Sequence, residues 1–526
     1  MPKDTYYITT AIDYTNAPPH IGHAYEKVLA DCIARYQRLG GKKVYFLTGV
    51  DQHGQKVQQT AATAGINPAT HVAKITKKFK ALWEALNLDY DGWAETTDDV
   101  HKRVVKAILR KLHDDGQIHK ATYSGFYSVK EEQYITEKER NEDGTWEAKW
   151  GEVVELEEEN YYFKLSEHLP WLLEFLKTNP DRVYPDFRLS QLVNAVEAAA
   201  GSDLCISRPK ERLTWGIEIP FDSDFVTYVW FDALTNYISF AGYLDESGEL
   251  PDFESLWPCD AHVIGKEILV PAHGVYWLCM LHALGFPDEH IPRLLVHGWW
   301  NIKGEKMSKT FGNIVDPHEL MEKVGADGLR YYLMSDISTG QDSDFSDERL
   351  LFRFNQDLAN DLGNLLNRTL NMIKRYQGGA LSGFTHEDEL NSNLRSQVEA
   401  LPDKYMKEME YFQVSKALAA VWEIISACNA YVDQCAPWAL AKDEANADRL
   451  ASVLYHLAET LAHISIYISP VIPNAAEKIR HQLRFELKEG FTLENVTWGM
   501  LSTGHETGKA KPLFPRLETD ESKKNP

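Results

Sequence analysis

Residues 16–23, with the sequence Asn-Ala-Pro-Pro-His-Ile-Gly-His, constrain the fold most, because they join a predicted strand to a predicted helix. Upstream, residues 5–12 are rich in β-branched and aromatic side chains, which is typical of a buried strand. Downstream, residues 24–38 have apolar positions at helical spacing, followed by a Gly-Gly stop. Because proline does not fit inside a helix, the two prolines mark the turn between the elements. The pattern predicts a strand–turn–helix unit of a parallel α/β sheet.

Two histidines, His20 and His23, fall on the first turn of this predicted helix. The unpaired backbone N–H groups and the positive dipole end of a helix attract anions there. Gly22 has no Cβ and lets a ligand approach the backbone. The turn suits a nucleoside triphosphate whose phosphates accept hydrogen bonds from both imidazoles. The alternative is that the histidines are capping or surface residues, since two histidines at a helix start are a weak motif.

A second basic stretch lies at residues 304–310, with the sequence Gly-Glu-Lys-Met-Ser-Lys-Thr. Lys306 and Lys309 can act there as mobile point charges on a polyphosphate, although a solvated basic turn is the simpler interpretation of the loop alone. The two stretches together, in this order and within a parallel-sheet pattern, resemble the signatures of class I aminoacyl-tRNA synthetases. The wider match, from about residue 6 to residue 516, is to the methionyl-tRNA synthetases.

The resemblance implies an α/β fold, in which a Rossmann-type parallel-sheet nucleotide-binding domain is split by a connective insertion and followed by an all-α helical-bundle anticodon-binding domain. Helix-length periodic segments at 353–376, 394–409, 413–434 and 448–467 support the bundle. A strand near Phe225 is expected to resume the parallel sheet. The expected ranges are 1–115 and 225–292 for the two halves of the catalytic domain, 116–224 for the insertion, 293–350 for a connector with the lysine loop, 351–500 for the anticodon-binding domain and 501–526 for a C-terminal tail.

A methionine pocket is also implied by the resemblance. A flexible thioether fits an aromatic-lined slot, and its sulfur can accept from a hydroxyl or imidazole such as that of Tyr14 or His273. The segment before His273 is one residue longer than the family pattern. An aromatic stripe at the helical spacing of Trp230 and Tyr237 is otherwise typical of core. The residues expected to line the pocket are Ile12, Tyr14, Asp51, Trp230, Ala233, Tyr237, Ile268 and His273.

Asp51 follows the second predicted strand, residues 43–47, and ligands of open α/β sheets bind beyond such strand ends. We expect it to hold the substrate ammonium group, and the alternative is a helix N-cap. The resemblance implies that Gly265 packs on adenine and that Glu267 accepts from the ribose hydroxyls. It also implies catalytic roles for His20, His23, Lys306 and Lys309. The expected ATP-binding residues are His20, Gly22, His23, Gly265, Glu267, Lys306 and Lys309, with Mg²⁺ arriving on the nucleotide.

Three residues of the predicted bundle correspond to anticodon-reading positions in the resemblance. Asn364 and Arg368 are four apart and share a helix face, and Trp438 follows Pro437. Single-stranded RNA bases are recognised by stacking on aromatic rings and by hydrogen bonds to their edges. A tryptophan in a helical bundle is also commonly part of the core, which is the alternative for Trp438.

Many relatives carry a zinc knuckle of C-x-x-C pairs in the insertion. Here residues 128–131 read Ser-Val-Lys-Glu, and residues 146–150 also lack Cys and His. A structural zinc site needs four such ligands, so no structural zinc is expected. The insertion is instead expected to be held by aromatic packing. The residues expected to pack there are Phe126, Tyr127, Trp146 and Trp150.

The net charge of −23 excludes indiscriminate nucleic-acid binding, which needs a cationic surface. Six scattered cysteines without a C-x-x-C pair favour reduced thiols over a disulfide framework. No apolar run reaches the length of a membrane span, and no signal or transit peptide is recognisable at the start. We therefore expect a cytoplasmic protein without membrane contact, and a monomer, whose partners are methionine, ATP and a methionine tRNA.

Three other functions remain open at this stage. A class I synthetase for another amino acid would share both signatures. A small nucleotidyltransferase would share the histidine stretch but not the helical C-terminal third. A synthetase-like RNA-binding protein that has lost its chemistry would keep the fold, although the intact histidines and lysines disfavour it.

Overall fold

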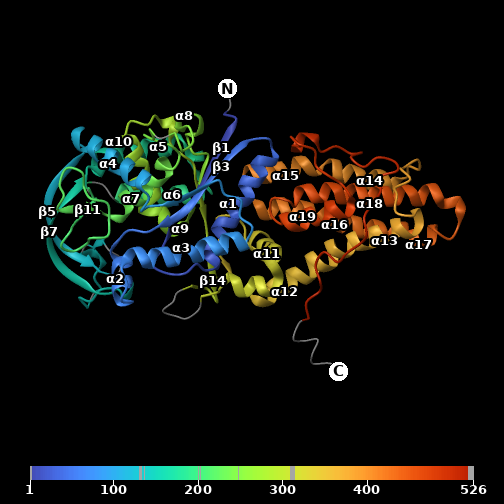
Figure 1. The fold of residues 1–526 in the computed structure, drawn as a ribbon, viewed down its shortest axis with the longest axis horizontal. Helices are drawn as coiled ribbons and strands as arrows, with labels where there is room; N and C mark the ends of the chain where they lie inside the picture. The colour runs from blue at the N-terminus through green and yellow to red at the C-terminus, as the bar shows by residue number, and fades with distance from the viewer. Residues whose placement is uncertain are drawn as a thin grey trace.

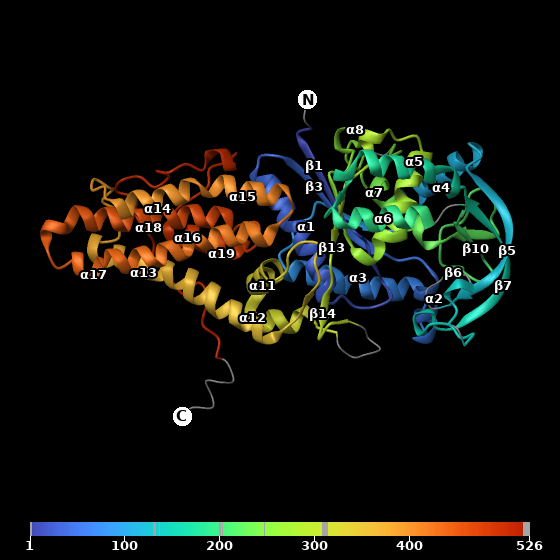
Figure 2. The same ribbon diagram turned by 180° about the vertical axis from the view of Figure 1, so that it is seen from behind.

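A computed structural model describes residues 3–518, except 130–132, 136, 142, 199–200, 202, 247 and 308–313. The molecule is elongated, with a parallel-sheet part at one end and a bundle of helices at the other (Figure 1). Helix α1 (Ile21–Leu39) lies between the two parts in both views (Figure 2). Helix α1 therefore adjoins both parts of the molecule.

The central sheet contains seven of the described strands, in the order β2-β3-β1-β12-β13-β8, with β4 also paired to β3. All neighbouring strands in this sheet pair in parallel. The first strand is buried along its second half, as expected for a parallel sheet covered by helices on both faces. The predicted Rossmann-type core is confirmed. The strand bounds are β1 Thr5–Thr10, β2 Asp13–Tyr14, β3 Lys43–Asp51, β4 Gly92–Glu95, β8 Val183–Tyr184, β12 Ala261–Gly265 and β13 Leu294–His297.

The expectation that the sheet resumes near Phe225 is wrong. Strand β11 (Phe225–Thr227) pairs antiparallel with β10 (Ser207–Pro209), in a two-stranded sheet of the described chain. After β11, the next strand of the central sheet is β12. A short apolar run predicts a strand but does not say which sheet the strand joins, and here the local partner β10 is used.

The insertion is built on a long antiparallel pair, β5 (Ile118–Ser128) and β7 (Val153–Phe163), with the shorter strands β6 (Gln133–Ile135) and β9 (Leu204–Cys205) at its edges. Figure 1 shows this pair at the end of the molecule opposite the bundle. Phe126 and Trp146 pack at 5.1 Å between ring centroids, and the Arg140 guanidinium lies over both rings. Between β7 and β9 the chain returns to the central sheet, where β8 pairs with β13, inside the range 116–224.

The helix predicted at residues 24–38 is present, with a slightly earlier start. Helix α1 begins at Ile21 rather than at Ala24, because His20 is its N-cap. The others in this part are α2 Gln55–Thr63, α3 Pro68–Ala85, α4 Asp99–Asp114, α5 Leu165–Thr178, α6 Phe187–Ala198, α7 Val229–Ser239, α8 Phe253–Leu256, α9 Lys266–Ile268, the π-helical η4 Leu269–Trp277, and α10 Leu278–Ala283.

The C-terminal bundle surrounds α18 (Ala447–Tyr467), whose residues 452–467 are all buried. The predicted helix at 394–409 is two helices, because Pro402 starts a new one. The chain then packs back along the bundle, where the buried Glu459 carboxylate accepts from the backbone N–H groups of Gly499, Met500 and Leu501. The other elements are α12 Asp347–Arg353, the π-helical η7 Phe354–Gly363, α13 Asn364–Gln377, α14 Glu389–Glu399, α15 Leu401–Glu410, α16 Val414–Cys435, α17 Pro437–Leu440 and α19 Pro473–Leu483.

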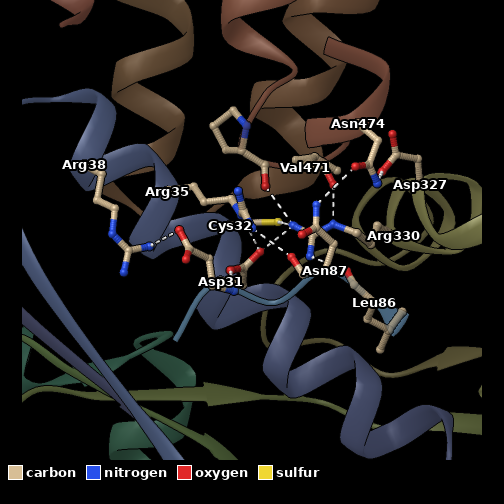
Figure 3. A network of polar contacts seen from close by, with 12 residues as sticks. Asp31, Cys32, Arg35, Arg38, Leu86, Asn87, Asp327, Arg330, Val471 and Asn474 are labelled. Carbon is tan, nitrogen blue, oxygen red and sulfur yellow. Dashed lines mark hydrogen bonds and ion pairs between the residues drawn. The ribbon is translucent and has the colours of Figure 1, made fainter. Parts of the chain in front are cut away.

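One buried side chain, Arg330 of α11 (Pro317–Ser335), joins the two parts (Figure 3). Its guanidinium donates to Asp31 Oδ2 of α1 at 2.6 Å and to the Leu86 carbonyl after α3 at 3.2 Å. It also donates to the carbonyls of Pro470 and Val471, between α18 and α19, at 3.0 and 2.6 Å. Arg330 and Asp31 are fully buried. The planar Arg330 guanidinium, whose N–H donors have fixed directions, therefore fixes the position of the bundle relative to α1.

Arg330→Met should destabilise the protein, because Asp31 keeps a buried charge that has lost this partner. Removing one member of a buried ion pair costs about 3–5 kcal/mol. Denaturant unfolding followed by tryptophan fluorescence measures the loss. Arg375→Met, at an exposed position of α13, is the matched control and should melt like the wild type. Equal stability of the two variants would show that Arg330 does not hold the joint.

Candidate active site

A cavity of about 460 Å³ opens at the carboxyl ends of β1, β3, β12 and β13. The predicted ATP and methionine residues whose positions are described all line it. They are Ile12, Tyr14, His20, Gly22, His23, Asp51, Trp230, Ala233, Tyr237, Gly265, Glu267, Ile268 and His273. Segments far apart in the sequence thus meet where ligands of open α/β sheets bind.

Hydrogen bonds in the first turn of α1 determine which ring nitrogen carries the proton in His20 and in His23. His20 Nδ1 accepts from the Gly22 N–H at 3.0 Å, and His23 Nδ1 accepts from the His20 N–H at 3.1 Å, in a reciprocal capping arrangement. A neutral imidazole that accepts at Nδ1 carries its proton on Nε2. Each ring therefore presents an Nε2–H donor. Gly22 is required for a further reason, since a Cβ there would lie 2.9 Å from His20 Cε1.

Both ring nitrogens of His273 have hydrogen-bond partners within the chain. Its Nδ1–H donates to the Ile268 carbonyl at 3.0 Å, and its Nε2 accepts from the Tyr237 hydroxyl at 2.7 Å. Burial lowers the pKa of His273 to about 4, so the ring is neutral at physiological pH. Its single ring proton is therefore already used. Of the two candidate sulfur donors, His273 therefore has no ring proton left to donate.

The segment that leads to His273 is irregular. Residues 269–277 form η4, but Val270 within it has an extended backbone, so two helical stretches meet there at a kink. His273 follows this kink and lines the cavity.

Asp51 ends β3 and accepts from the His53 N–H at 3.3 Å and from the Thr96 hydroxyl at 3.4 Å. The alternative role of Asp51 as the N-cap of α2 is wrong, because that position is Gly54. The loop after Asp51 is anchored to α7 through Asp232, whose carboxylate binds His53 at 2.7 Å.

Asp232 also binds His101 of α4, at 2.8 Å. Although burial opposes ionisation, the two histidines hold the pKa of Asp232 at about 2. Asp232 lies on α7 between Trp230 and Ala233, two cavity residues. The contacts of Asp232 with His53 and His101 therefore hold in place the part of α7 that lines the cavity.

Several lining residues were not predicted, among them Asp13, Glu26, His297 and Trp299. His297 ends strand β13, so the strand-end rule that identified Asp51 applies to it equally. Trp299 Nε1 donates to Glu267 Oε2 at 2.5 Å, and the Lys266 ammonium lies 3.9 Å from the Trp299 ring centroid. No sequence motif marks this contact.

The lysine loop begins at the cavity. Strands β14 (Trp300–Ile302) and β15 (Glu305–Lys306) form a hairpin, and the buried Met307 lines the cavity. The side chain of Lys306 and the whole of Lys309 lie outside the described residues.

The predicted anticodon residues lie on helices of the bundle. Trp438 is 45% exposed on α17, so the alternative of a core tryptophan is wrong. Arg368 of α13 pairs with Asp433 of α16 at 3.0 Å, and Asn364 is exposed at the start of α13. Figure 1 shows α17 at the end of the bundle that is remote from the sheet.

The family model described as "tRNA synthetases class I (M)" matches residues 6–143 and 148–370. A second model, "Anticodon binding domain of methionyl tRNA ligase", matches residues 378–525. The chain belongs to the methionyl-tRNA synthetase family of class I. Both signatures that first suggested the family lie within the first match.

Curated relatives agree with this membership. A methionine–tRNA ligase of Caldanaerobacter subterraneus subsp. tengcongensis is 41% identical over 98% of this chain and 80% of its own length. That of Bacillus subtilis is 40% identical over 99% of this chain and 79% of its own length. The solved structure of Mycobacterium tuberculosis methionyl-tRNA synthetase in complex with methionyl-adenylate has a TM-score of 0.90 at 37% identity, covering 97% of this chain and all of that one.

Two further structural findings concern expected absences. Within the described ranges, no helix has the length and apolarity needed to cross a bilayer. The same part of the chain contains no group of three or more His, Cys, Asp or Glu side chains arranged to hold a metal ion.

His273→Gln should make the protein less sensitive to acid. The unfolded chain protonates His273 near its ordinary pKa of about 6.5, whereas the folded protein resists protonation down to about 4, so lowering the pH through this window destabilises the native state. At pH 5 the cost is about 2 kcal/mol. Glutamine can donate to Ile268 and accept from Tyr237 without titrating.

Melting temperatures measured at pH 7.5 and pH 5 test this expectation. The drop should be smaller in His273→Gln than in the wild type, and unchanged in the control His318→Gln, which alters an exposed histidine. An identical drop in all three proteins would mean that His273 is not held neutral.

Proposed function

We propose that the chain is a methionine–tRNA ligase. It activates L-methionine with ATP to methionyl-adenylate and pyrophosphate, and then passes the methionyl group to the 3′ end of its tRNA. The observation that carries this proposal is the cavity itself, which is lined both by a helix N-terminus whose two histidines keep a proton on Nε2 and by an aromatic slot. The related solved structure binds methionyl-adenylate, which joins the two ligand halves that such a cavity would accept.

In the first step, the methionine carboxylate attacks the α-phosphorus of ATP. Catalysis here is positioning and electrostatic stabilisation, since no protein group has to move a proton. His20 and His23 donate to the phosphates from the positive end of α1, and Lys306 and Lys309 close over the pyrophosphate. Gly265 packs on adenine, and Glu267, oriented by Trp299, accepts from the ribose.

Mg²⁺ accompanies the nucleotide and neutralises charge on its phosphates. It keeps several of its waters and binds mainly through the phosphate oxygens of the nucleotide.

Methionine occupies the aromatic half of the cavity in this proposal. Asp51 orients the ammonium group, and Trp230, Ala233 and Tyr237 of α7 form one wall. Ile12, Ile268 and His273 complete the slot, with His273 holding the Tyr237 hydroxyl in place. Tyr14 then contacts the sulfur, which distinguishes a thioether from an alkyl chain.

The second step needs the tRNA to reach from the bundle to the cavity. Asn364, Arg368 and Trp438 read the anticodon in this proposal, while the 3′ end enters the cavity. With a net charge of −23, binding depends on local contacts rather than long-range attraction. We further propose that the protein is a cytoplasmic monomer without structural zinc, organised in the ranges given above, with β8 contributing to the catalytic sheet.

ATP–pyrophosphate exchange with a panel of amino acids tests the proposed activity. Exchange with methionine alone supports it. Exchange with another amino acid would reassign the substrate. No exchange with any amino acid would favour a synthetase-like RNA-binding protein.

Lys309→Ala should lower the turnover number of exchange by about tenfold to a hundredfold while methionine affinity changes little, because the lysine meets its phosphates mainly in the transition state. Steady-state exchange and equilibrium methionine binding measure the two effects. Lys303→Asn removes a charge from the neighbouring hairpin, and asparagine tolerates the positive φ of 53° there. That control should behave as the wild type. Equal losses of turnover and affinity in Lys309→Ala would contradict this role.

Trp438→Ala should reduce tRNA charging efficiency roughly tenfold to a hundredfold, since stacking contributes about 1–3 kcal/mol per base. Methionine-dependent exchange without tRNA should hardly change, because the cavity lies in the other part of the molecule. The melting temperature should hold, because the side chain is exposed. Tyr411→Ala, which removes another exposed aromatic ring between α15 and α16, is the control and should charge normally. A parallel fall of charging, exchange and melting temperature would make Trp438 structural.

A further inference from the structure

Lys27 of α1 lies one helical turn after His23 and is completely buried. Its ammonium group donates to the Ala11 carbonyl at 2.9 Å, to Asp13 Oδ1 at 2.7 Å and to Glu26 Oε1 at 2.7 Å. An ammonium group has three N–H donors, so these contacts occupy all of them. Its Nζ also lies 5.8 Å from the Trp83 ring centroid.

The contacts of Lys27 continue to the far side of the cavity through Glu26. The second oxygen of this carboxylate binds His297 Nε2 at 3.0 Å, and His297 Nδ1 faces the Gly298 carbonyl at 2.7 Å. Both acceptors require a proton on the nitrogen that faces them, so His297 is an imidazolium. Glu26 raises the pKa of His297 despite the burial of the ring.

Two carboxylates and two cations therefore balance within one buried cluster, and Asp13, Glu26 and His297 also line the cavity. Such a cluster is costly to bury, because every ion loses its hydration. Burial raises the pKa of Asp13, although the Lys27 ammonium opposes the rise. Burial would also raise the pKa of Glu26, but Lys27 and His297 hold it below its ordinary value. An apolar core would fill this place at lower cost.

The cluster joins three segments that carry different parts of the site. Residues 11–14 carry Ile12 and Tyr14 of the methionine wall. Helix α1 carries His20 and His23, and His297 ends β13 on the nucleotide side. Lys27 holds the first two segments together directly and the third through Glu26.

We propose that Lys27 is a positioning residue of adenylate formation, which holds the methionine wall and the phosphate-binding turn of α1 at the separation that the attack requires. The inference rests on the proposed function and assigns a further residue to it. Each ligand binds mainly to one segment, whereas the transition state needs both in register. Misplacement by about 1 Å can cost a hundredfold in rate. Loss of the link should therefore lower turnover more than it weakens either ligand.

Three variants of the full chain separate positioning from mere charge balance. Lys27→Met removes the link and leaves Asp13 without its cation, so both stability and turnover should fall. The double variant Lys27→Met with Asp13→Asn removes both charges and keeps the Glu26–His297 pair. Lys80→Met is the matched control, because Lys80 also pairs with a glutamate, Glu95, and lies over a tryptophan ring, but outside the cavity.

Melting temperature and methionine-dependent ATP–pyrophosphate exchange are measured for each protein. The double variant should regain most of the melting temperature lost in Lys27→Met, while its turnover number stays at least about tenfold below wild type and each KM changes less than about threefold. Lys80→Met should match the wild type.

Several results would overturn the inference. Wild-type turnover in Lys27→Met or in the double variant would show that the link is not needed. A double variant that melts as low as Lys27→Met would show that Asp13 is not the charge that Lys27 balances. Absence of exchange in the wild type itself would instead refute the proposed function, so the two failures are distinguishable.

Discussion

The histidine rings in the first turn of α1 serve two purposes at once, because they cap the helix through Nδ1 and keep a proton on Nε2. The backbone N–H groups of this turn need acceptors, and His20 and His23 supply them through Nδ1. Each ring is thereby left with its proton on Nε2, which is the form that can donate to a phosphate. The cap of the helix and the proposed phosphate site are thus one arrangement, and a substitution at either histidine changes both. In this proposal, an acidic protein offers a local site for a polyanion at one helix N-terminus.

Residues further along α1 connect this first turn to other parts of the molecule. One turn below His23, Lys27 ties the helix to the methionine wall. Further along, Asp31 receives the Arg330 guanidinium, which also binds carbonyls of the bundle (Figure 3). Arg35 adds a second donor to Asp31 at 2.8 Å. A single rigid helix therefore connects the site of chemistry to the part that carries the proposed anticodon contacts.

Local pattern was enough to predict the strand–turn–helix unit and the bundle, and the strand-end rule pointed to Asp51, because parallel strands bring their carboxyl ends together wherever they lie in the sequence. Most of the other predicted cavity residues came from the resemblance to the family. Local pattern did not predict the partner of β11, since an apolar run carries no information on which strand it will join. The Asp13–Lys27–Glu26–His297 cluster was also missed. Charged residues at these positions are normally assigned to solvent, and only the three-dimensional structure shows that they meet in the interior. The use of both His273 nitrogens likewise depends on partners that sequence spacing does not reveal.

A crystal structure of the protein with methionine and a non-hydrolysable ATP analogue tests the central claim most directly. The account predicts that the Nε2 atoms of His20 and His23 lie within hydrogen-bond distance of phosphate oxygens, about 2.7–3.2 Å, while both Nδ1 atoms still accept from the backbone of α1. Methionine should occupy the slot beside Tyr237, with its ammonium group at Asp51. Phosphates bound elsewhere, or rings turned so that Nδ1 faces the nucleotide, would contradict the account.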